Sequence, residues 1–479
     1  VKKIEPRRVP TGDMVNSIVI ESDGEFKEVE YQAVEDVSAL SKEEIINRIK
    51  EAGVVGMGGA GFPTHVKLSP KEPEKIDYII ANCAECEPYL TSDYRIMLDH
   101  TEELVEGMRI ILSMFEHAKG VFAVENNKPD CIAKLLELTK DEPRMEVAPL
   151  MTKYPQGGER QLIYAVTKRA INSKMLPADA GCIVDNVATM VAVYHAVKEG
   201  KPVTSRIFTV TGDAVEDPGN FEFLIGTSFQ ELLDAAGGFK EQPEKIISGG
   251  PMMGFSMFGL DVPTTKTTSA LLCMTKDEVA EADADATACI NCGRCVEACP
   301  EQIVPSRLSK FSEHGDMAGF EKWHGLECVE CGSCSFICPA KRPLAQLIKT
   351  MKKQVLADFN EYYTKHSLDK TVPYDGITEL LTKLDELSIK YAIMSNKPDK
   401  FTKSIAAKLF PDNKFAAAWG QRPDFERKPC PDALLAMLAE LGFDKSDCLY
   451  IGDSNVDVQT AKNLSLIHIS EPTRQAEIS

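Results

Sequence analysis

The sequence has 479 residues, of which 43% are hydrophobic and 27% charged, and this length favours several domains over one. With 54 lysines and arginines against 73 aspartates and glutamates, the net charge of −19 argues against a nucleic-acid-binding protein. No run of 18 or more apolar residues occurs, so we expect no transmembrane segment of the chain's own. The first residues also lack a basic-then-apolar pattern, so we expect a reducing compartment and free thiols.

Residues 1–33 predict a pair of strands with turns at residues 10–13 and at Asp23-Gly24. An amphipathic helix is expected over residues 41–52, where Ser41 caps the start and Glu44 completes a capping box. From residue 34 to residue 200, helical and strand patterns alternate, which predicts an α/β nucleotide-binding domain.

A glycine-rich segment, GVVGMGGAGFPTHVKL, follows the first helix at residues 53–68. Glycines leave backbone N–H groups free to approach a phosphate or a flat ring, and a following lysine offers a positive charge. An ordinary turn is the alternative, because a lone glycine-rich loop is a weak signal. The candidate binding residues here are Gly56, Gly58, Gly59, Gly61 and Lys67.

The next segment, residues 75–81, predicts a buried strand that runs into Asn82-Cys83-Ala84-Glu85-Cys86-Glu87-Pro88. Carboxylates just after a strand lie where α/β sheets bind ligands, so Glu85 and Glu87 are candidates for ribose and nicotinamide. A solvated acidic turn is the alternative. Cys83 and Cys86 form a CxxC-like pair, which is either a third redox site or a pair of small residues beside a bound ring.

Residues 201–262 are rich in strand patterns, with a turn expected at residues 217–220, and an acidic linker follows at residues 277–285. Beyond the linker, CINCGRCVEACP at residues 289–300 and CVECGSCSFICP at 328–339 both read C-x2-C-x2-C-x3-C-P. In two-cluster ferredoxins the fourth cysteine of each run binds the other cluster. We therefore assign one [4Fe-4S] cluster to Cys289, Cys292, Cys295 and Cys338, and a second to Cys328, Cys331, Cys334 and Cys299.

Structural zinc and disulfides are the alternatives for these runs, although zinc sites usually use two CxxC pairs. His324, between the runs, is interpreted as packed or solvated because eight cysteines already fill the ligand positions. The basic residues at the end of the module are interpreted as a solvated helix end, with a partner surface as the alternative; they are Lys341, Arg342, Lys349, Lys352 and Lys353.

Two further segments complete a resemblance to a known family. Tyr154-Pro155-Gln156-Gly157-Gly158-Glu159-Arg160 and Asn186-Val187-Ala188-Thr189 follow the glycine-rich and Asn82–Pro88 segments in order. Together with the dicluster runs, they make residues 1–355 resemble the C subunit of the Rnf ion-translocating electron-transport complex. The flavoprotein subunit of respiratory complex I is also similar, although its N-G-D-E-G-E-P segment differs from this one at Cys83, Ala84 and Cys86.

The resemblance implies that these segments hold FMN and NADH. Gly58, Gly59 and Lys67 would face phosphate, and Glu85 and Glu87 would face ribose and nicotinamide. The flavin would be lined by Tyr154, Gly157, Glu159, Asn186 and Thr189, with Gly56, Gly61 and Asn82 completing the cofactor-binding set. No residue is expected to act as a general acid or base.

The fold class implied is α/β multidomain. We expect a remnant of a barrel-sandwich domain at 1–33, an upstream part of which is missing, and a Rossmann-like FMN/NADH-binding domain at 34–200. A β-grasp-like (SLBB-type) domain is expected at 201–270 and an α-helical, ferredoxin-like dicluster module at 277–355.

The implied function is electron transfer between NADH and ferredoxin through FMN and two [4Fe-4S] clusters, coupled to ion transport. The partners would be integral-membrane and other subunits of the complex, with ferredoxin as an indirect partner, and the chain would lie peripherally on the cytoplasmic face of the cell membrane. The alternative is a soluble NADH-dependent electron-transfer protein that serves a reductase such as proline reductase.

Residues 359–464 resemble part of a phosphoglycolate phosphatase of the haloacid dehalogenase superfamily. Ser395 and Asn396 match its phosphate-binding motif, Lys428 its lysine, and Asp453 and Asp457 its Mg²⁺ carboxylates. The nucleophile motif D-x-D-G-T occurs nowhere in the chain, so no aspartyl-phosphate can form and we expect neither phosphatase activity nor a core of its own.

Residues 465–479, SLIHISEPTRQAEIS, interrupt the phosphatase pattern and resemble a translated sequencing adapter, so we predict a non-native tail. The whole polypeptide is interpreted as an assembly chimera of a truncated electron-transport subunit and a phosphatase fragment, with a genuine fusion as the alternative.

Overall fold

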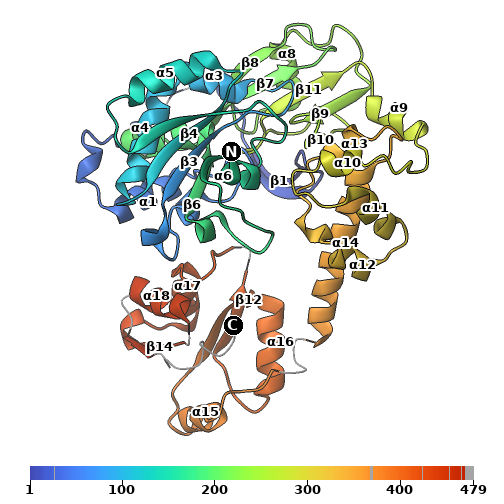
Figure 1. The fold of residues 1–479 in the computed structure, drawn as a ribbon. Helices are drawn as coiled ribbons and strands as arrows, with labels where there is room; N and C mark the ends of the chain where they lie inside the picture. The colour runs from blue at the N-terminus through green and yellow to red at the C-terminus, as the bar shows by residue number, and fades with distance from the viewer. Residues whose placement is uncertain are drawn as a thin grey trace. The chain divides into compact units, whose positions relative to one another are not determined.

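The computed structural model describes residues 1–464 and 467–469, except residues 26, 28, 367–370, 423 and 453. The predicted tail at 465–479 therefore lies outside the described residues apart from 467–469. The chain divides into two compact units, Val1–Lys352 and Lys353–Ser479, and the first holds every segment expected to bind a flavin or a cluster (Figure 1). Among the described residues, no helix is long and apolar enough to span a membrane.

The first unit opens with the predicted strand pair: β1 (Lys3–Arg8) and β2 (Met14–Val19) are antiparallel, with Lys3 opposite Val19. The predicted helix is α1 (Lys42–Glu51). Its capping box is confirmed, because the Ser41 N–H donates to the Glu44 carboxylate at 2.7 Å and the Glu44 N–H donates to the Ser41 hydroxyl at 3.3 Å.

A four-stranded parallel sheet forms the centre of this unit, in the order β5-β4-β3-β6. Its strands are β3 (Tyr78–Cys83), β4 (Lys119–Glu125), β5 (Met145–Leu150) and β6 (Cys182–Asn186). The chain runs from β3 outward to β4 and β5 and then returns to the other side of β3 to form β6. This reversal places a switch point between β3 and β6, where parallel sheets open a crevice for ligands.

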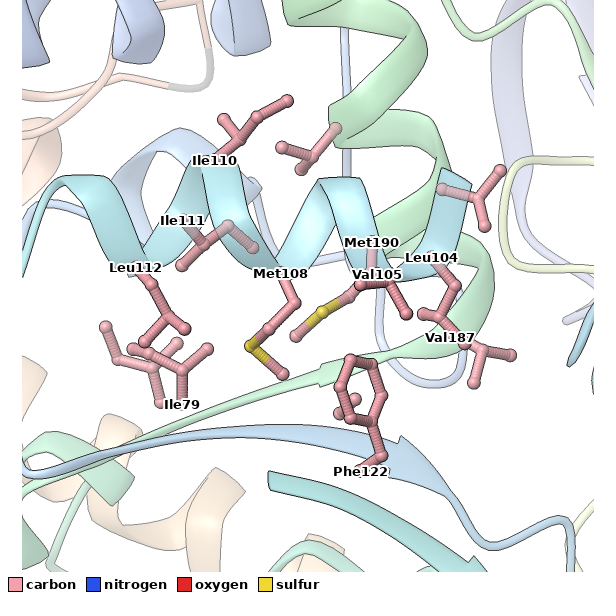
Figure 2. Packing of buried hydrophobic residues seen from close by; sticks show 14 of the residues in the cluster. Ile79, Leu104, Val105, Met108, Ile110, Ile111, Leu112, Phe122, Val187 and Met190 are labelled. Atoms are coloured by element: carbon pink, nitrogen blue, oxygen red, sulfur yellow. The ribbon is translucent and has the colours of Figure 1, made fainter. Parts of the chain in front are cut away.

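Alternate residues of β3 face opposite layers, as the two-residue period of a strand requires. Ile79, Ala81 and Cys83 pack with one group of helices, and Ile80 packs on the other face with Leu162 of α6. The first face is covered by α1, α3 (Ser92–Asp99), α4 (Thr101–Ser113), α5 (Pro129–Thr139) and α7 (Val187–Tyr194), and the second by α6 (Glu159–Thr167). Figure 2 shows Met108 of α4 directed toward the sheet, and Met190 of α7 beside it.

Helices α4 and α7 approach each other closely at Gly107. A Cβ atom added there would lie 2.2 Å from the Met190 carbonyl oxygen, so only glycine fits this crossing. This packing holds α7 in place, and α7 begins at the end of β6 beside the switch point.

A second, mixed sheet follows, in the order β10-β9-β11-β7-β8, with α8 (Phe229–Ala235) packed on it. Its strands are β7 (Ser205–Thr211), β8 (Gly219–Leu224), β9 (Lys245–Ser248), β10 (Phe255–Ser256) and β11 (Ala270–Met274). The acidic segment expected as a linker contains a helix, α9 (Glu278–Ala284).

The cysteine-rich region is helical. Its elements are α10 (Arg294–Glu297), α11 (Pro305–Glu313), α12 (Met317–Lys322), α13 (Ser333–Phe336) and the start of α14 (Leu344–His366). Each short helix after a CxxC turn begins behind a left-handed glycine, Gly293 or Gly332, with φ of 80° in both. The duplicated sequence thus gives a duplicated local structure.

The second unit contains α15 (Ile377–Glu386), β12 (Ala392–Pro398), α16 (Asp399–Leu409), β13 (Ala417–Gln421), α17 (Asp432–Leu441), β14 (Leu449–Ile451), α18 (Asn455–Asn463) and β15 (Ile467–Ile469). Strands β12 and β13 are parallel, as are β14 and β15. The expectation that this segment has no core is wrong, because Trp419, Met437 and Tyr450 belong to a buried cluster of their own.

Candidate functional site

The carboxyl ends of β3 and β6 bring two predicted site residues together, since Asn82 is the register partner of Asn186. Asn186 caps α7 by accepting the Ala188 N–H at 2.9 Å, and its amide donates to the Asp93 carboxylate at 2.6 Å. Its side chain is therefore fixed at both ends. This rigidity matters because the glycine-rich loop lies directly against it.

The glycine-rich loop crosses Asn186 at Gly58. A Cβ atom there would lie 2.9 Å from the Asn186 Cβ and Nδ2 atoms, whereas one at Gly59 would meet nothing within 4 Å. The Met57 N–H donates to the Thr189 hydroxyl at 3.0 Å, which ties the loop to α7. Gly58, Asn186 and Thr189, predicted from separate segments, thus form one cradle over the switch point.

Lys67 lies on the same crevice but is already paired. Its Nζ atom donates to the Val184 carbonyl at 2.7 Å and to the buried Asp185 carboxylate at 3.0 Å. Burial raises the pKa of Asp185, and the Lys67 ammonium opposes that effect. One carboxylate oxygen of Asp185 is buried without a hydrogen-bond partner, so the pair keeps an unused acceptor. The phosphate-binding role of Lys67 stays a prediction.

The Tyr154–Arg160 segment is joined to the end of β3 by Asn82 and Cys86. The Asn82 amide donates to the Gly157 carbonyl at 2.9 Å, and the Gly157 N–H points to the Cys86 Sγ atom at 3.3 Å. A Cβ atom at Gly157 would lie 2.4 Å from the Ala84 carbonyl oxygen. The close approach explains why glycine is needed at residue 157.

Glu85 binds the start of α3. Its carboxylate accepts the N–H groups of Asp93 at 2.8 Å and Tyr94 at 3.1 Å. Burial, and next the charge of Asp93, raise the pKa of Glu85 to about 7. Burial likewise raises the pKa of Asp93.

Glu87 binds a different domain. Its carboxylate accepts the Met252 N–H at 3.1 Å and the Met253 N–H at 2.8 Å, and burial raises its pKa. The alternative of a solvated acidic turn is therefore wrong for Glu85 and Glu87, since both carboxylates are engaged by backbone N–H groups. Whether they also face ribose and nicotinamide stays a prediction.

A buried arginine from the second sheet supports the glycine-rich loop, and sequence reasoning missed it. Arg206 donates to the Met57 carbonyl at 2.8 Å and also to the Lys266 carbonyl, and its charge acts on Asp93. Burial lowers the pKa of Arg206 to about 10. Arg206 lies within β7, where nothing in the local pattern distinguishes it from an exposed strand residue.

Tyr154 and Arg160 connect this crevice to the cysteine-rich module. The Tyr154 hydroxyl donates to the Cys331 carbonyl at 2.7 Å. Arg160, on α6, forms ion pairs with Glu301 at 2.9 Å and Glu327 at 3.0 Å. Glu159, the first residue of α6, has an exposed side chain.

Four cysteines from both runs line one pocket. They are Cys299 from the first run and Cys328, Cys331 and Cys334 from the second, with Ile303, Ala345 and Ile348 among the apolar walls. The charges of Cys299, Cys328 and Cys331 each act on Cys334, so the four thiols are mutual neighbours. This neighbourhood supports the predicted exchange of fourth cysteines between the runs, which stays a prediction.

The chemistry of this pocket fits an iron–sulfur cluster. Four cysteine sulfurs are the ligand set of a [4Fe-4S] cluster, and burial raises the pKa of the free Cys328 thiol to about 11 and that of Cys334 to about 12. Among the described residues, no three histidine, cysteine, aspartate or glutamate side chains form a site for a single metal ion. All fifteen cysteines have free thiols, so the disulfide alternative is wrong.

For the other quartet, Cys295 lies in a small buried cluster with Leu344 and with Cys334 of the first quartet, and Cys338 packs against this cluster. Cys295 is buried and Cys292 is exposed, so this quartet reaches the surface. The exposed position of His324 agrees with its interpretation as a solvated residue.

Cys83 and Cys86 lie in different surroundings, and different charged groups influence the two thiols. Cys83 is fully buried near Cys131 and Asp93, and burial raises its pKa well above the usual range, while Cys86 faces Gly157 with a pKa raised to about 11. Neither thiol is activated as a redox cysteine would be.

The interpretation of the basic stretch as a solvated helix end is wrong for Lys352. Its Nζ atom donates to the Cys328 carbonyl at 2.8 Å and pairs with Glu330 at 3.3 Å. Lys349 pairs with Glu330 at 3.4 Å, and Arg342 pairs with Glu313.

In the second unit, Lys428 and Asp457 meet as the phosphatase resemblance implies, with the Nζ atom 2.6 Å from the carboxylate. The Asn396 amide donates to the Lys428 carbonyl at 3.1 Å. Ser395 lies on β12, and Asp453 lies outside the described residues.

Family models match four parts of the chain. They are the Nuo51 FMN-binding domain at residues 49–195, the SLBB domain at 207–256, the 4Fe-4S dicluster domain at 288–342 and the haloacid dehalogenase-like hydrolase family at 335–469. The first unit is therefore that of a flavin- and iron–sulfur-dependent electron-transfer protein. FMN and two [4Fe-4S] clusters are its cofactors.

Curated relatives narrow this class. The chain is 42% identical, over 74% of its length and 80% of the relative's, to the C subunit of the Na⁺-translocating ferredoxin:NAD⁺ oxidoreductase complex of Acetobacterium woodii. It is 46% identical, over 61% of its length, to the C subunit of the proton-translocating ferredoxin:NAD⁺ oxidoreductase complex of Clostridium ljungdahlii, of which it spans 64%. The chain belongs to the family formed by the C subunits of ion-translocating ferredoxin:NAD⁺ oxidoreductases, the Rnf family.

A solved NAD⁺-reducing [NiFe]-hydrogenase structure, in the H2-reduced state, is also similar. The match has a TM-score of 0.47 at 18% identity and covers 74% of this chain and 67% of that one.

Proposed function

We propose that this chain, as the C subunit of a membrane-bound ion-translocating oxidoreductase of the Rnf type, passes electrons between NADH and ferredoxin through FMN and two [4Fe-4S] clusters, coupled to ion transport. Bound FMN would supply the conversion between two-electron hydride transfer and single-electron steps. The chain's own residues bind and orient. Gly58, Asn186 and Thr189 form the cradle at the switch point, and the cysteine quartets hold the clusters.

The observation that carries the proposal is the contact between the two halves of the site. Tyr154, in a segment expected to line the flavin, donates to the carbonyl of Cys331, which lines the four-cysteine pocket. A hydrogen-bonded junction of this kind keeps a nucleotide crevice and a cluster in fixed register. Electron transfer depends on that fixed separation.

The proposed partners follow from the relatives, which are named as subunits of multisubunit complexes. We infer that integral-membrane subunits and other subunits of such a complex bind this chain, that ferredoxin is an indirect partner, and that the chain lies on the cytoplasmic face of the cell membrane. The lack of a membrane-spanning helix among the described residues is compatible with peripheral attachment.

Anaerobic reconstitution of the chain tests the proposal. After treatment with iron, sulfide and FMN, we expect about eight iron atoms and one FMN per chain, and bleaching of the cluster absorbance when NADH is added. Binding of FMN without any reduction by NADH would overturn the assignment of NADH as electron donor.

A soluble electron-transfer protein that serves a reductase is the second candidate, and neither the contacts of the two quartets nor the named relatives favour it. The two candidates differ in where native protein is found. Co-purification of the native chain with detergent-extracted membrane proteins supports the first, and its recovery with a soluble reductase supports the second.

A further inference from the structure

The loop that carries three cysteines of the second run, residues 328–334, is held by three contacts, two of which come from outside the cysteine-rich module. The first is Tyr154, whose hydroxyl donates to the Cys331 carbonyl at 2.7 Å. The phenol ring is half-buried, and the charges of Glu87, Cys331 and Cys86 all act on it. Tyr154 therefore lies at the point where the end of β3 meets this loop.

A second contact reaches the same loop through the mixed-sheet domain. The Glu87 carboxylate holds the Met252 and Met253 N–H groups, and the Met252 carbonyl oxygen lies 3.2 Å from the place a Cβ atom would occupy at Gly332. Gly332 has a φ of 80°, and this left-handed backbone conformation also favours glycine at this residue. Gly332 of the loop thus packs against Met252, and the preceding residue, Cys331, accepts the hydrogen bond from Tyr154.

The third contact is a hydrogen bond from a charged donor. Lys352 donates to the Cys328 carbonyl at 2.8 Å, so two backbone carbonyls of the loop, those of Cys328 and Cys331, accept from side-chain donors. Donors and positive charge near the cysteine ligands of a cluster favour its reduced form, because reduction adds negative charge to the cluster and its ligands.

We propose that Tyr154 is a positioning residue for the cluster held by Cys299, Cys328, Cys331 and Cys334. Its hydroxyl fixes the ligand loop to the flavin-binding segment and, by donating to the Cys331 carbonyl, raises the reduction potential of that cluster. The inference rests on the proposed function, and it deepens it by assigning to Tyr154 a role toward the cluster in addition to any contact with the flavin.

The test is a redox titration of Tyr154→Phe, followed by electron paramagnetic resonance and flavin absorbance. The variant keeps the ring and removes only the hydroxyl. We expect a lower potential for one cluster, an unchanged potential for the other, and slower reduction of the shifted cluster after mixing with NADH. Tyr164→Phe is the matched control, because Tyr164 is an exposed tyrosine on α6.

Lys352→Met identifies which signal belongs to this cluster. Loss of the ammonium beside Cys328 should lower the same potential that Tyr154→Phe lowers, with FMN content unchanged. If the two variants shift different clusters, the assignment of Tyr154 to the Cys328–Cys334 loop is wrong.

If Tyr154→Phe does not fold, replacement of Tyr154 by 3-fluorotyrosine provides a second test, because it keeps the hydroxyl group. Fluorination makes the phenol a stronger donor, so the potential should rise. Unchanged potentials for both clusters in the phenylalanine or fluorotyrosine protein overturn the inference, as does loss of FMN with both potentials unchanged, which would place Tyr154 at the flavin alone. If the wild-type chain takes up neither FMN nor clusters, the proposed function fails and so does the inference. If the wild-type chain takes up both and the variants leave both cluster potentials unchanged, only the inference is refuted.

Discussion

The Asn82 side-chain amide donates a 2.9 Å hydrogen bond to the Gly157 carbonyl, and this bond joins two of the four segments expected to hold the flavin. The same asparagine accepts the Ala84 N–H at 3.2 Å, so its orientation at the end of β3 is fixed. Segments 75 residues apart in sequence are thereby held at one edge of the sheet. Substitutions at this edge should therefore affect flavin binding before they affect the clusters.

Gly58→Ala should impair flavin binding. Its Cβ atom would lie 2.9 Å from Asn186, whose side chain cannot move without losing its bonds to Ala188 and Asp93. Overpacking of this kind costs about 1–3 kcal/mol, which corresponds to an about 5- to 150-fold loss of FMN affinity if the loop is displaced. Fluorescence titration with FMN measures the effect. Gly259→Ala, outside the predicted binding residues, is the control, because a Cβ atom there meets nothing within 4 Å, and equal affinities for both variants would contradict the loop geometry.

Glu85 should make the local stability of α3 depend on pH. Its pKa is about 7 in the folded chain against an ordinary 4.5, so the folded state holds a proton that the unfolded state releases. Stability should therefore be highest below pH 4.5 and fall as the pH rises to about 7, by at most about 3 kcal/mol.

Glu85→Gln should abolish most of this slope, although it also weakens the start of α3. Hydrogen exchange of peptides that cover α3, corrected for intrinsic rates, measures it between about pH 5 and pH 8. Glu146→Gln, at an exposed carboxylate, should leave the slope intact. A slope that persists in Glu85→Gln would assign the titration to Asp93 instead.

Arg160→Gln should loosen the cysteine-rich module from α6. The side chains of Arg160 and Glu301 are only 19% and 12% exposed, so their ion pair is largely shielded from water. We expect a coupling of about 1–3 kcal/mol in a double-mutant cycle with Glu301→Gln, read from protease susceptibility of residues 288–342. The exposed pair of Arg95 and Asp99 provides the comparison, with an expected coupling below about 1 kcal/mol. Equal couplings for the two pairs would refute the docking role of Arg160.

Cys299→Ser and Cys331→Ser should affect the same cluster, although the two residues belong to different runs. Both line one pocket, so each variant should disturb one resonance signal and leave the other, with iron content reduced toward about four atoms per chain. Cys338→Ser should disturb the other signal. If Cys299→Ser instead resembles Cys292→Ser, the exchange of fourth cysteines between the runs is wrong.

The purified chain should release no phosphate from phosphoglycolate in the presence of Mg²⁺. Lys428 and Asp457 are paired in the second unit, but the sequence has no D-x-D-G-T nucleophile motif to receive the phosphoryl group. A malachite-green assay checks this. Phosphate release that Asp457→Asn abolishes would contradict the argument from the missing nucleophile.

The parts of the site that sequence reasoning could find are those whose chemistry repeats locally. The cysteine spacing predicted the quartets, and Ser41 with Glu44 predicted the start of α1, because both patterns act over a few residues. The sequence also indicated Asn82, at the end of a predicted strand, and Asn186, through the resemblance of its segment to the family, and the structure pairs the two in register on β3 and β6.

What sequence reasoning missed depends on contacts between distant segments. The contact of Glu87 with the Met252 and Met253 amides was not predicted, and Lys352 was interpreted as solvated but binds the Cys328 carbonyl. Arg206 showed no signal because a buried arginine in a strand looks like any other until its partners are placed. Such partners are set by how domains pack, which a single chain's local pattern does not encode.

The uneven covering of the two cysteine quartets has a consequence for handling the protein in air. Cys331 and Cys334 are buried, whereas Cys292 is exposed. Dioxygen and peroxide would meet the Cys292 corner first, so aerobic decay should begin with the cluster farther from the flavin crevice and leave the inner one reducible for longer.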